Sequence, residues 1–245
     1  MIAALDHLVL RALFLDGAVG AYETLFGRRA TNGLFRLGNV GLAIEDEAST
    51  AHLSAMVFAT GSLDEAERLL ERRGVPGVRG NDRLVLAPEA THQVPIALIQ
   101  HKESHALSPL VGPDEAASIS ALDHVVIRSP NPERAVAFYG GRLGLDLRLD
   151  RSNPRWNARL LFFRCGDLVV EIAHDSSRGL SDEPDQLWGL SWRTPDIARC
   201  HARLTKAGVE LSEPREGRRA GTQVFTVHSH TANVPTIVIG GLGRW

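Results

Sequence analysis

The stretch LDHLVLR at residues 5–11 returns as LDHVVIR at residues 122–128, an offset of 117 residues. Further matches follow in the same order along the chain. Residues 38–44 match residues 166–172, and later pairs match at offsets that grow to 140. Internal similarity of this kind indicates repeated structural units. The offset grows between expected elements, where loops tolerate insertion. The sequence therefore predicts two copies of one module, with the longer loops in the second.

The two copies are separated by a segment without clean hydrophobic periodicity. Residues 105–118 contain two prolines and a glycine, which is typical of a connector. We therefore expect an N-terminal module at residues 1–104, a linker at 105–118 and a C-terminal module at 119–245, the last being the working one.

Composition excludes several classes of protein. Hydrophobic residues make up 44% of the 245 residues and charged residues 23%, close to the globular average. The net charge of −2 gives no general attraction to nucleic acid or anionic lipid. No apolar run reaches the ~18 residues of a membrane span, and the first residues do not resemble a secretory signal. The two cysteines lack metal-site spacing, so we expect a cytoplasmic protein whose partner is a small molecule.

Each half predicts a strand, a helix and three more strands, twice over. In the second half, Asn131 and Pro132 begin a helix that runs to about Leu143, and Gly144 ends it. Asp196 caps a second helix, which ends at Gly208. The strands are expected at residues 124–128, 145–150, 159–164, 168–173, 187–193, 210–211, 223–227 and 236–239.

This β-α-β-β-β pattern, the Leu-Asp-His start and the helix ending FYGGRLG at residues 138–144 resemble the vicinal oxygen chelate superfamily. Its members include glyoxalase I, extradiol dioxygenases, methylmalonyl-CoA epimerase and bleomycin-resistance proteins. The resemblance covers nearly the whole chain as two tandem modules. It implies an α+β fold in which two βαβββ units per module form an open, cup-shaped mixed sheet. Because this fold supports unrelated chemistries, function has to be argued from the site.

The resemblance implies metal ligands on the first, fourth, fifth and eighth strands of a module. Side chains alternate between the faces of a strand, so His124 and Glu171 are both expected to face the cup. A carboxylate in the middle of an apolar strand is costly to bury without a partner. The other two ligand positions fall on Gly189 and Val238, which offer no donor.

The first module is poorer in candidate ligands. It keeps His7, but the equivalents of the other three positions are Ala43, Ala55 and Leu98. In the second module, a loop histidine would have to complete the metal site of His124 and Glu171. The candidates are His174, His228 and His230.

Four further residues are candidates for substrate binding. Arg128, Arg193 and Ser191 are expected on the cup face, where a guanidinium suits a carboxylate or phosphate. The alternative is that both arginines lie at strand ends and extend into solvent. Trp156 lies in the longest insertion, where it would cover an aromatic or acyl ligand or pack between modules or subunits.

Three functions remain open from the sequence. The first is an enzyme of the lyase, isomerase or dioxygenase type, with His124 and Glu171 as catalytic residues and ligands of one divalent metal (iron, manganese, zinc or nickel). The second is a metal-free enzyme in which the same pair transfers a proton. The third is a metal-free binding or resistance-type protein. The sequence also leaves open whether the cups close within one chain or across a homodimer.

Overall fold

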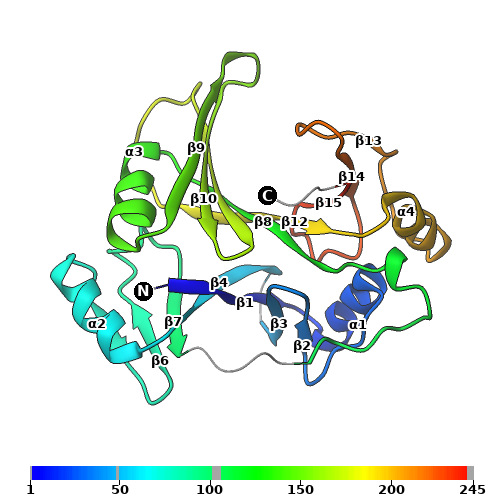
Figure 1. Ribbon diagram of the computed structural model, residues 1–245, viewed down its shortest axis with the longest axis horizontal. Helices are drawn as coiled ribbons and strands as arrows, with labels where there is room; N and C mark the ends of the chain where they lie inside the picture. The colour runs from blue at the N-terminus through cyan, green and yellow to red at the C-terminus, as the bar shows by residue number, and fades with distance from the viewer. Residues whose placement is uncertain (1, 48–49, 101–105, 242–245) are drawn as a thin grey trace. The chain divides into compact units, whose positions relative to one another are not determined.

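A computed structural model describes residues 2–47, 50–100 and 106–241 of the chain. The described part has two mixed sheets and few helices, which confirms the expected α+β class (Figure 1). One sheet has the strand order β2-β3-β1-β4-β7-β6-β5, and the other has the order β13-β14-β15-β12-β8-β11-β10-β9. Residues 104 and 105, where the linker was expected to begin, lie outside the described ranges, so these boundaries stay a prediction.

The first sheet and its helices come from the first half of the chain. Its elements in chain order are β1 (Ile2–Ala12), α1 (Leu15–Phe26), β2 (Leu34–Arg36), β3 (Gly41–Asp46), β4 (His52–Thr60), α2 (Leu63–Arg72), β5 (Gly77–Arg79), β6 (Arg83–Leu86) and β7 (Ile96–Gln100).

The second sheet and its helices come from the second half. After the 3₁₀ turn η1 (Glu115–Ala117), its elements are β8 (Ala121–Arg128), α3 (Pro132–Ala135), η2 (Val136–Arg142), β9 (Asp146–Asn153), η3 (Pro154–Trp156), β10 (Ala158–Cys165), β11 (Leu168–Asp175), β12 (Gln186–Arg193), α4 (Ile197–Lys206), β13 (Arg215–Glu216), β14 (Gln223–Val227) and β15 (Thr236–Gly240).

One expected strand is missing from the described part of the first half. Between α1 and β4 only β2 and β3 form, whereas the second half has β9, β10 and β11 at the equivalent place. The repeat is eleven residues shorter here, because residues 28–37 correspond to residues 145–165. Those ten residues leave no room for a hairpin as long as β9–β10.

The predicted helix caps are confirmed. The Asn131 side chain accepts a hydrogen bond from the Arg134 N–H, and Asp196 accepts one from the Arg199 N–H. Gly144 has φ +78° and Gly208 has φ +79°, the left-handed conformation that ends a helix.

Two expected elements differ in the structure. The helix after Asn131 is α-helical only to Ala135 and then continues as a π-helix, with Leu143 N–H donating to the Phe138 carbonyl. The adjacent glycines at 140 and 141 favour α-helix poorly, which explains the change. The strand expected at residues 210–211 does not form, and Leu211 makes only an isolated bridge to Val227.

The chain divides into two compact units, each drawing on both halves of the sequence. Unit 1 holds the described residues within 1–8, 54–104 and 124–188, and unit 2 holds those within 9–53, 105–123 and 189–245. In unit 1, β11 pairs with β8 in parallel and with β10 antiparallel. In unit 2, the rings of Phe26 and the fully buried Trp192 meet edge to face at 4.8 Å.

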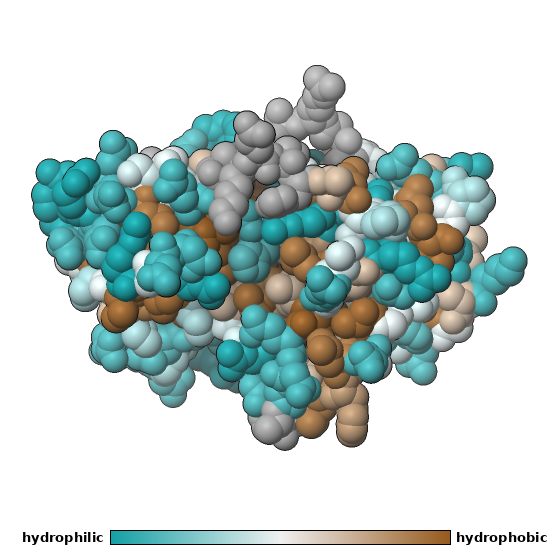
Figure 2. Space-filling view, turned by 90° about the horizontal axis from the view of Figure 1, so that it is seen from below, coloured by the Kyte–Doolittle hydropathy of each residue, from teal (hydrophilic) through white to brown (hydrophobic). Residues whose placement is uncertain are grey.

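The surface is mixed. Figure 2 shows one face on which hydrophobic residues form small groups among hydrophilic ones. The most exposed large apolar side chains are Phe14 and Val78. Among the helices of the described residues, none is long and apolar enough to cross a membrane.

Candidate functional site

His124 and Glu171 lie side by side in unit 1. β8 and β11 run parallel, with Val169 opposite His124 and Glu171 opposite Val126, so the two side chains share a face. His124 Nε2 lies 3.3 Å from Glu171 Oε2, and the side chains are 17% and 10% exposed. The structure therefore brings together the two residues that alternation placed on one face, and it gives the nearly buried carboxylate a partner.

The apolar residues between them fix this arrangement. Val125 and Ile127 of β8, together with Val170 and Ile172 of β11, are fully buried on the opposite face. A one-residue slip of either strand would exchange the two faces and place an ionisable side chain in the core. The register of the pair is therefore set by the hydrophobic pattern of the two strands.

The chemistry open to the pair is proton transfer. An ionised carboxylate only accepts hydrogen bonds, whereas an imidazole either donates or accepts. A proton can therefore be held between Nε2 and Oε2 or given to a third group within reach. The partial exposure of both side chains leaves room for that third group to approach.

A divalent metal fits the separation of these atoms but not the donor set. Two atoms that bind one ion at about 2.1 Å lie roughly 3.0–3.4 Å apart, close to the 3.3 Å between Nε2 and Oε2. However, no group of three or more His, Cys, Asp or Glu that could hold a metal occurs among the described residues. Two protein donors make a weak site, so the residues present do not fit the metal centre that the resemblance implies.

The fifth-strand position shows why a ligand is absent. A Cβ atom built on Gly189 would lie 2.9 Å from the Pro235 carbonyl oxygen. Any residue larger than glycine would therefore require the backbone at Pro235, just before β15, to move. Val238, at the eighth-strand position, is fully buried. Both residues belong to unit 2.

The rings of two of the three loop histidines have other partners, and the third, His228, is exposed. His174 is buried, and its Nδ1 lies 3.1 Å from the Ser129 carbonyl oxygen. His230 Nδ1 lies 2.9 Å from Ser229 Oγ in a turn where His230 has φ +61°. No described contact places either ring beside Glu171.

Arg128, a predicted substrate-binding residue, lies over an aromatic ring in unit 1. Its Cζ is 4.0 Å from the ring centroid of Trp188, well within the range of a cation–π contact. Arg128 is exposed and Trp188 is half-buried. The sequence pattern did not predict this partnership. It could be found only once β12 was known to lie next to β8 in the sheet.

Ser191 and Arg193 are placed in unit 2. The Arg193 Nε donates to Asp123 Oδ1 at 3.1 Å, and Asp123 is only 2% exposed. The sequence pattern did not predict this ion pair. Ser191 is fully buried, and its Oγ has no hydrogen-bond partner among the described residues. Their roles in substrate binding stay predictions.

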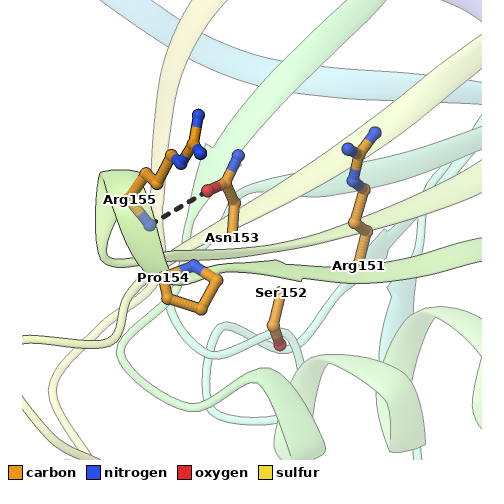
Figure 3. A pocket seen from close by; sticks show the side chains of 5 residues that line it. All are labelled: Arg151, Ser152, Asn153, Pro154 and Arg155. Carbon is orange, nitrogen blue, oxygen red and sulfur yellow. Dashed lines mark hydrogen bonds between the residues drawn. The ribbon is translucent and has the colours of Figure 1, made fainter.

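Trp156 ends the turn between β9 and β10 and is 54% exposed. Beside it lies a hollow of about 510 Å³ lined by residues 151–155. Figure 3 shows Arg151, Asn153 and Arg155 projecting to one side of the chain, with Asn153 accepting a hydrogen bond from the Arg155 N–H. Because five consecutive residues line it, this hollow belongs to the hairpin itself and includes neither His124 nor Glu171.

The cysteines offer no nucleophile. Both are buried, as expected for small hydrophobic residues. Burial raises the pKa of Cys165 to about 12 and raises the pKa of Cys200 as well, so the reactive thiolate is disfavoured at both positions.

Comparison with known proteins confirms the resemblance to the vicinal oxygen chelate superfamily. Residues 123–226 match the family model described as the Glyoxalase/Bleomycin resistance protein/Dioxygenase superfamily. The matched residues include the His124–Glu171 pair. The chain thus has the superfamily's fold in two sheet modules, and its second module carries the superfamily's sequence pattern.

Solved structures with this fold cover the whole chain at low sequence identity. BphC, a halotolerant catechol dioxygenase, has a TM-score of 0.74 at 11% identity and covers 100% of this chain and 89% of its own. A mutant of 4-hydroxymandelate synthase from Streptomyces coelicolor has a TM-score of 0.75 at 11% identity, covering 100% and 94%. The Mn(II)-bound glyoxalase from Novosphingobium aromaticivorans has a TM-score of 0.70 at 14% identity, covering 99% and 83%. No curated protein sequence matches significantly. These identities show a common fold alone.

Proposed function

We propose that this chain is an enzyme that transfers a proton on a small organic molecule at the β8–β11 face of its C-terminal module. The observation that carries the proposal is the 3.3 Å contact between His124 Nε2 and Glu171 Oε2 on a partly open sheet face. The match of residues 123–226 to a superfamily that contains glyoxalases and dioxygenases supports an enzyme acting on a small molecule.

The proposed step is enolisation. The Glu171 carboxylate removes a proton from a carbon next to a carbonyl group, and the protonated His124 ring donates its proton to the carbonyl oxygen. The electron pair of the broken C–H bond forms the C=C bond of the enol. The reverse transfers return both protons and regenerate the substrate, which carries hydrogen from solvent at that carbon once the Glu171 carboxylic acid has exchanged. No oxidant or metal enters this balance.

Exchange of substrate hydrogen with solvent tests the proposal. Small ketones, aldehydes and thioesters with a C–H next to the carbonyl are incubated with the protein in D₂O, and loss of that C–H signal is followed by NMR. We expect exchange above background for at least one compound, with His124→Gln and Glu171→Gln each lowering its rate at least 100-fold. Absence of exchange for every compound would contradict the proposal.

The first repeat offers a matched control. His7 occupies the position of His124, but Ala43 stands where Glu171 does, and the His7 ring instead contacts the neighbouring Asp6 at 2.6 Å. His7→Gln should leave exchange unchanged. If it lowers exchange as much as His124→Gln does, the reaction is not confined to the second module. If ligand binding survives the loss of both His124 and Glu171 and no turnover is found, the metal-free binding protein is favoured instead.

A further inference from the structure

We propose that the substrate carries a carboxylate group, which the guanidinium of Arg128 binds while it lies on the Trp188 ring. The inference rests on the proposed function at His124 and Glu171, because it assigns the substrate class to that same sheet face. The two copies of the repeat differ in what surrounds this arginine.

In the first repeat, the equivalent arginine is neutralised. Arg11 Nε lies 3.5 Å from Glu45 Oε2, and its Nη1 lies 3.6 Å from Glu47 Oε2. Glu45 of β3 and Glu47, just after β3, therefore accompany the arginine at the end of β1. Such exposed ion pairs contribute little to stability, but they occupy the anion-binding edge of the guanidinium.

In the second repeat, one of the two acids has been replaced. At the offset of 128 residues that aligns these strands, Glu45 corresponds to Ala173 and Glu47 to Asp175. The Asp175 carboxylate accepts hydrogen bonds from Ser177 and lies 3.5 Å from Arg178 Nε. Ala173 is the register partner of Arg128 across β11 and β8. No ion pair or hydrogen bond joins Arg128 to another of the described residues, and its one described contact is the Trp188 ring at 4.0 Å.

The Trp188 contact leaves the binding edge of the guanidinium open. A ring stacked on the planar group covers one of its faces and limits its motion, while the N–H groups around the edge stay available. Those N–H groups match the two oxygens of a carboxylate. A fixed, unneutralised cation on an exposed strand end is thus suited to a monoanion, and Trp188 is its positioning residue.

The position of Arg128 relates the anion to the reacting groups. His124, Val126 and Arg128 share a face of β8, and Glu171 and Ala173 lie opposite Val126 and Arg128 on β11. Four residues of strand separate the Cα atoms of His124 and Arg128 by about 13 Å. The side chains between them are the small and apolar Val126 and Ala173. A substrate with its carbonyl at the pair and its carboxylate towards Arg128 would lie over this floor.

NMR of the full chain tests the inference directly. The side-chain Nε–Hε signal of Arg128 and the indole N–H signal of Trp188 are followed during titration with 4-oxopentanoate, its methyl ester, benzoate, benzamide and inorganic phosphate. We expect saturable shifts of both signals with the two carboxylates, and at least tenfold weaker effects with the ester, the amide and phosphate. Equal effects of charged and neutral partners, a preference for phosphate, or no shift with any carboxylate would overturn the inference.

Four substitutions make the test specific. Arg128→Gln removes the cation, and Ala173→Glu restores the acid of the first repeat while Arg128 stays in place. Each should weaken the binding of 4-oxopentanoate at least tenfold, and Arg11→Gln, the matched control, should change it less than twofold. If Ala173→Glu unfolds the chain, Arg128→Gln and Trp188→Leu still decide the question. Carboxylate affinity that survives Arg128→Gln overturns the inference.

The failure of this inference differs from that of the proposed function. If the wild-type protein binds 4-oxopentanoate through Arg128 but exchanges no C–H in any compound, the proton-transfer proposal fails and the carboxylate site stands. If it exchanges the ester and the acid equally well and Arg128 does not respond, only the carboxylate site fails. The variant that lacks both His124 and Glu171 should retain the Arg128 shifts.

Discussion

His92 is a histidine whose surroundings disfavour its charged form. It lies in the loop between β6 and β7, and its ring meets the Phe138 ring edge to face at 5.7 Å. Burial lowers the pKa of His92, the charge of Arg134 lowers it further, and Asp185 acts in the opposite direction. The unfolded chain, where the pKa is about 6.5, therefore takes up this proton before the folded chain does.

His92 therefore makes the stability of the fold depend on pH. As the pH falls through about 6.5 towards the lower folded value, proton uptake by the unfolded state lowers the free energy of unfolding. We expect His92→Asn to remove this loss, because asparagine does not titrate here and tolerates the φ of +54° at this position. Urea unfolding at mildly acid and mildly alkaline pH measures it. An equal pH slope in the variant and the wild type would contradict the assignment.

At the same scale, alternation along a strand predicted the candidate pair but not all of its neighbours. His124 and Glu171 could be placed from their own strands, because the side-chain period of two is local. The contact of Arg128 with Trp188, and that of Arg193 with Asp123, depend on which strands adjoin and on the reach of a long side chain at a strand end. Neither is encoded in the period of a single strand.

At the scale of elements, the C-terminus of α1 is capped by a residue 179 positions away from Thr24. Arg203 of α4 donates from Nη1 to the Thr24 carbonyl at 2.6 Å, from Nη2 to the Leu25 carbonyl at 2.8 Å, and from Nε to the Ala117 carbonyl at 2.9 Å. The last turn of α1 has no basic residue of its own. Arg203 therefore supplies the positive charge that the negative end of a helix favours.

We expect Arg203→Ala to lower the free energy of unfolding by about 2–3 kcal/mol, because three partly buried carbonyl groups lose a charged donor. Arg203→Lys should recover only part of this, since an ammonium group cannot reproduce the planar fork. Arg199→Ala on the same helix is the matched control. Its guanidinium meets Asp114 at 3.2 Å with 59% of the side chain exposed, so a loss below about 1 kcal/mol is expected. Urea unfolding of the three variants measures these losses. Equal losses in Arg203→Ala and Arg199→Ala would contradict the capping role.

The elements of the second half follow the sequence pattern wherever their bounds depend on local chemistry. Most strands of the second half lie within a residue or two of their predicted bounds, and both caps are confirmed, because each rests on local chemistry. The strand expected at residues 210–211 does not form, because contacts with a distant part of the chain decide its hydrogen bonding. Ser229 Oγ accepts from the Glu210 N–H and Ser212 Oγ accepts from the Thr226 N–H, so side chains replace part of the backbone ladder.

At the scale of the molecule, the connector is part of a core. Arg28, only 3% exposed, donates to the carbonyl oxygens of Ser108 and Ile119 and meets Glu115 at 3.3 Å. These contacts bind residues 106–119 to the end of α1 within unit 2. The repeat could be predicted from the sequence because it is found by comparing positions along the chain. The division into compact units could not, since each unit combines strands from both repeats.

The second module offers a metal ion only two of the four ligands that the family pattern implies. Gly189 is packed against Pro235 and Val238 is buried, so His124 and Glu171 stand without the other two ligands of the family pattern. We expect the purified chain to keep its rate of substrate C–H exchange with solvent, within about twofold, after dialysis against a chelator. Elemental analysis should find well below one equivalent of iron, manganese, zinc or nickel after incubation with each. One equivalent of metal that is lost in both His124→Gln and Glu171→Gln, together with chelator-sensitive exchange, would overturn the proton-transfer proposal and favour the metal-dependent enzyme.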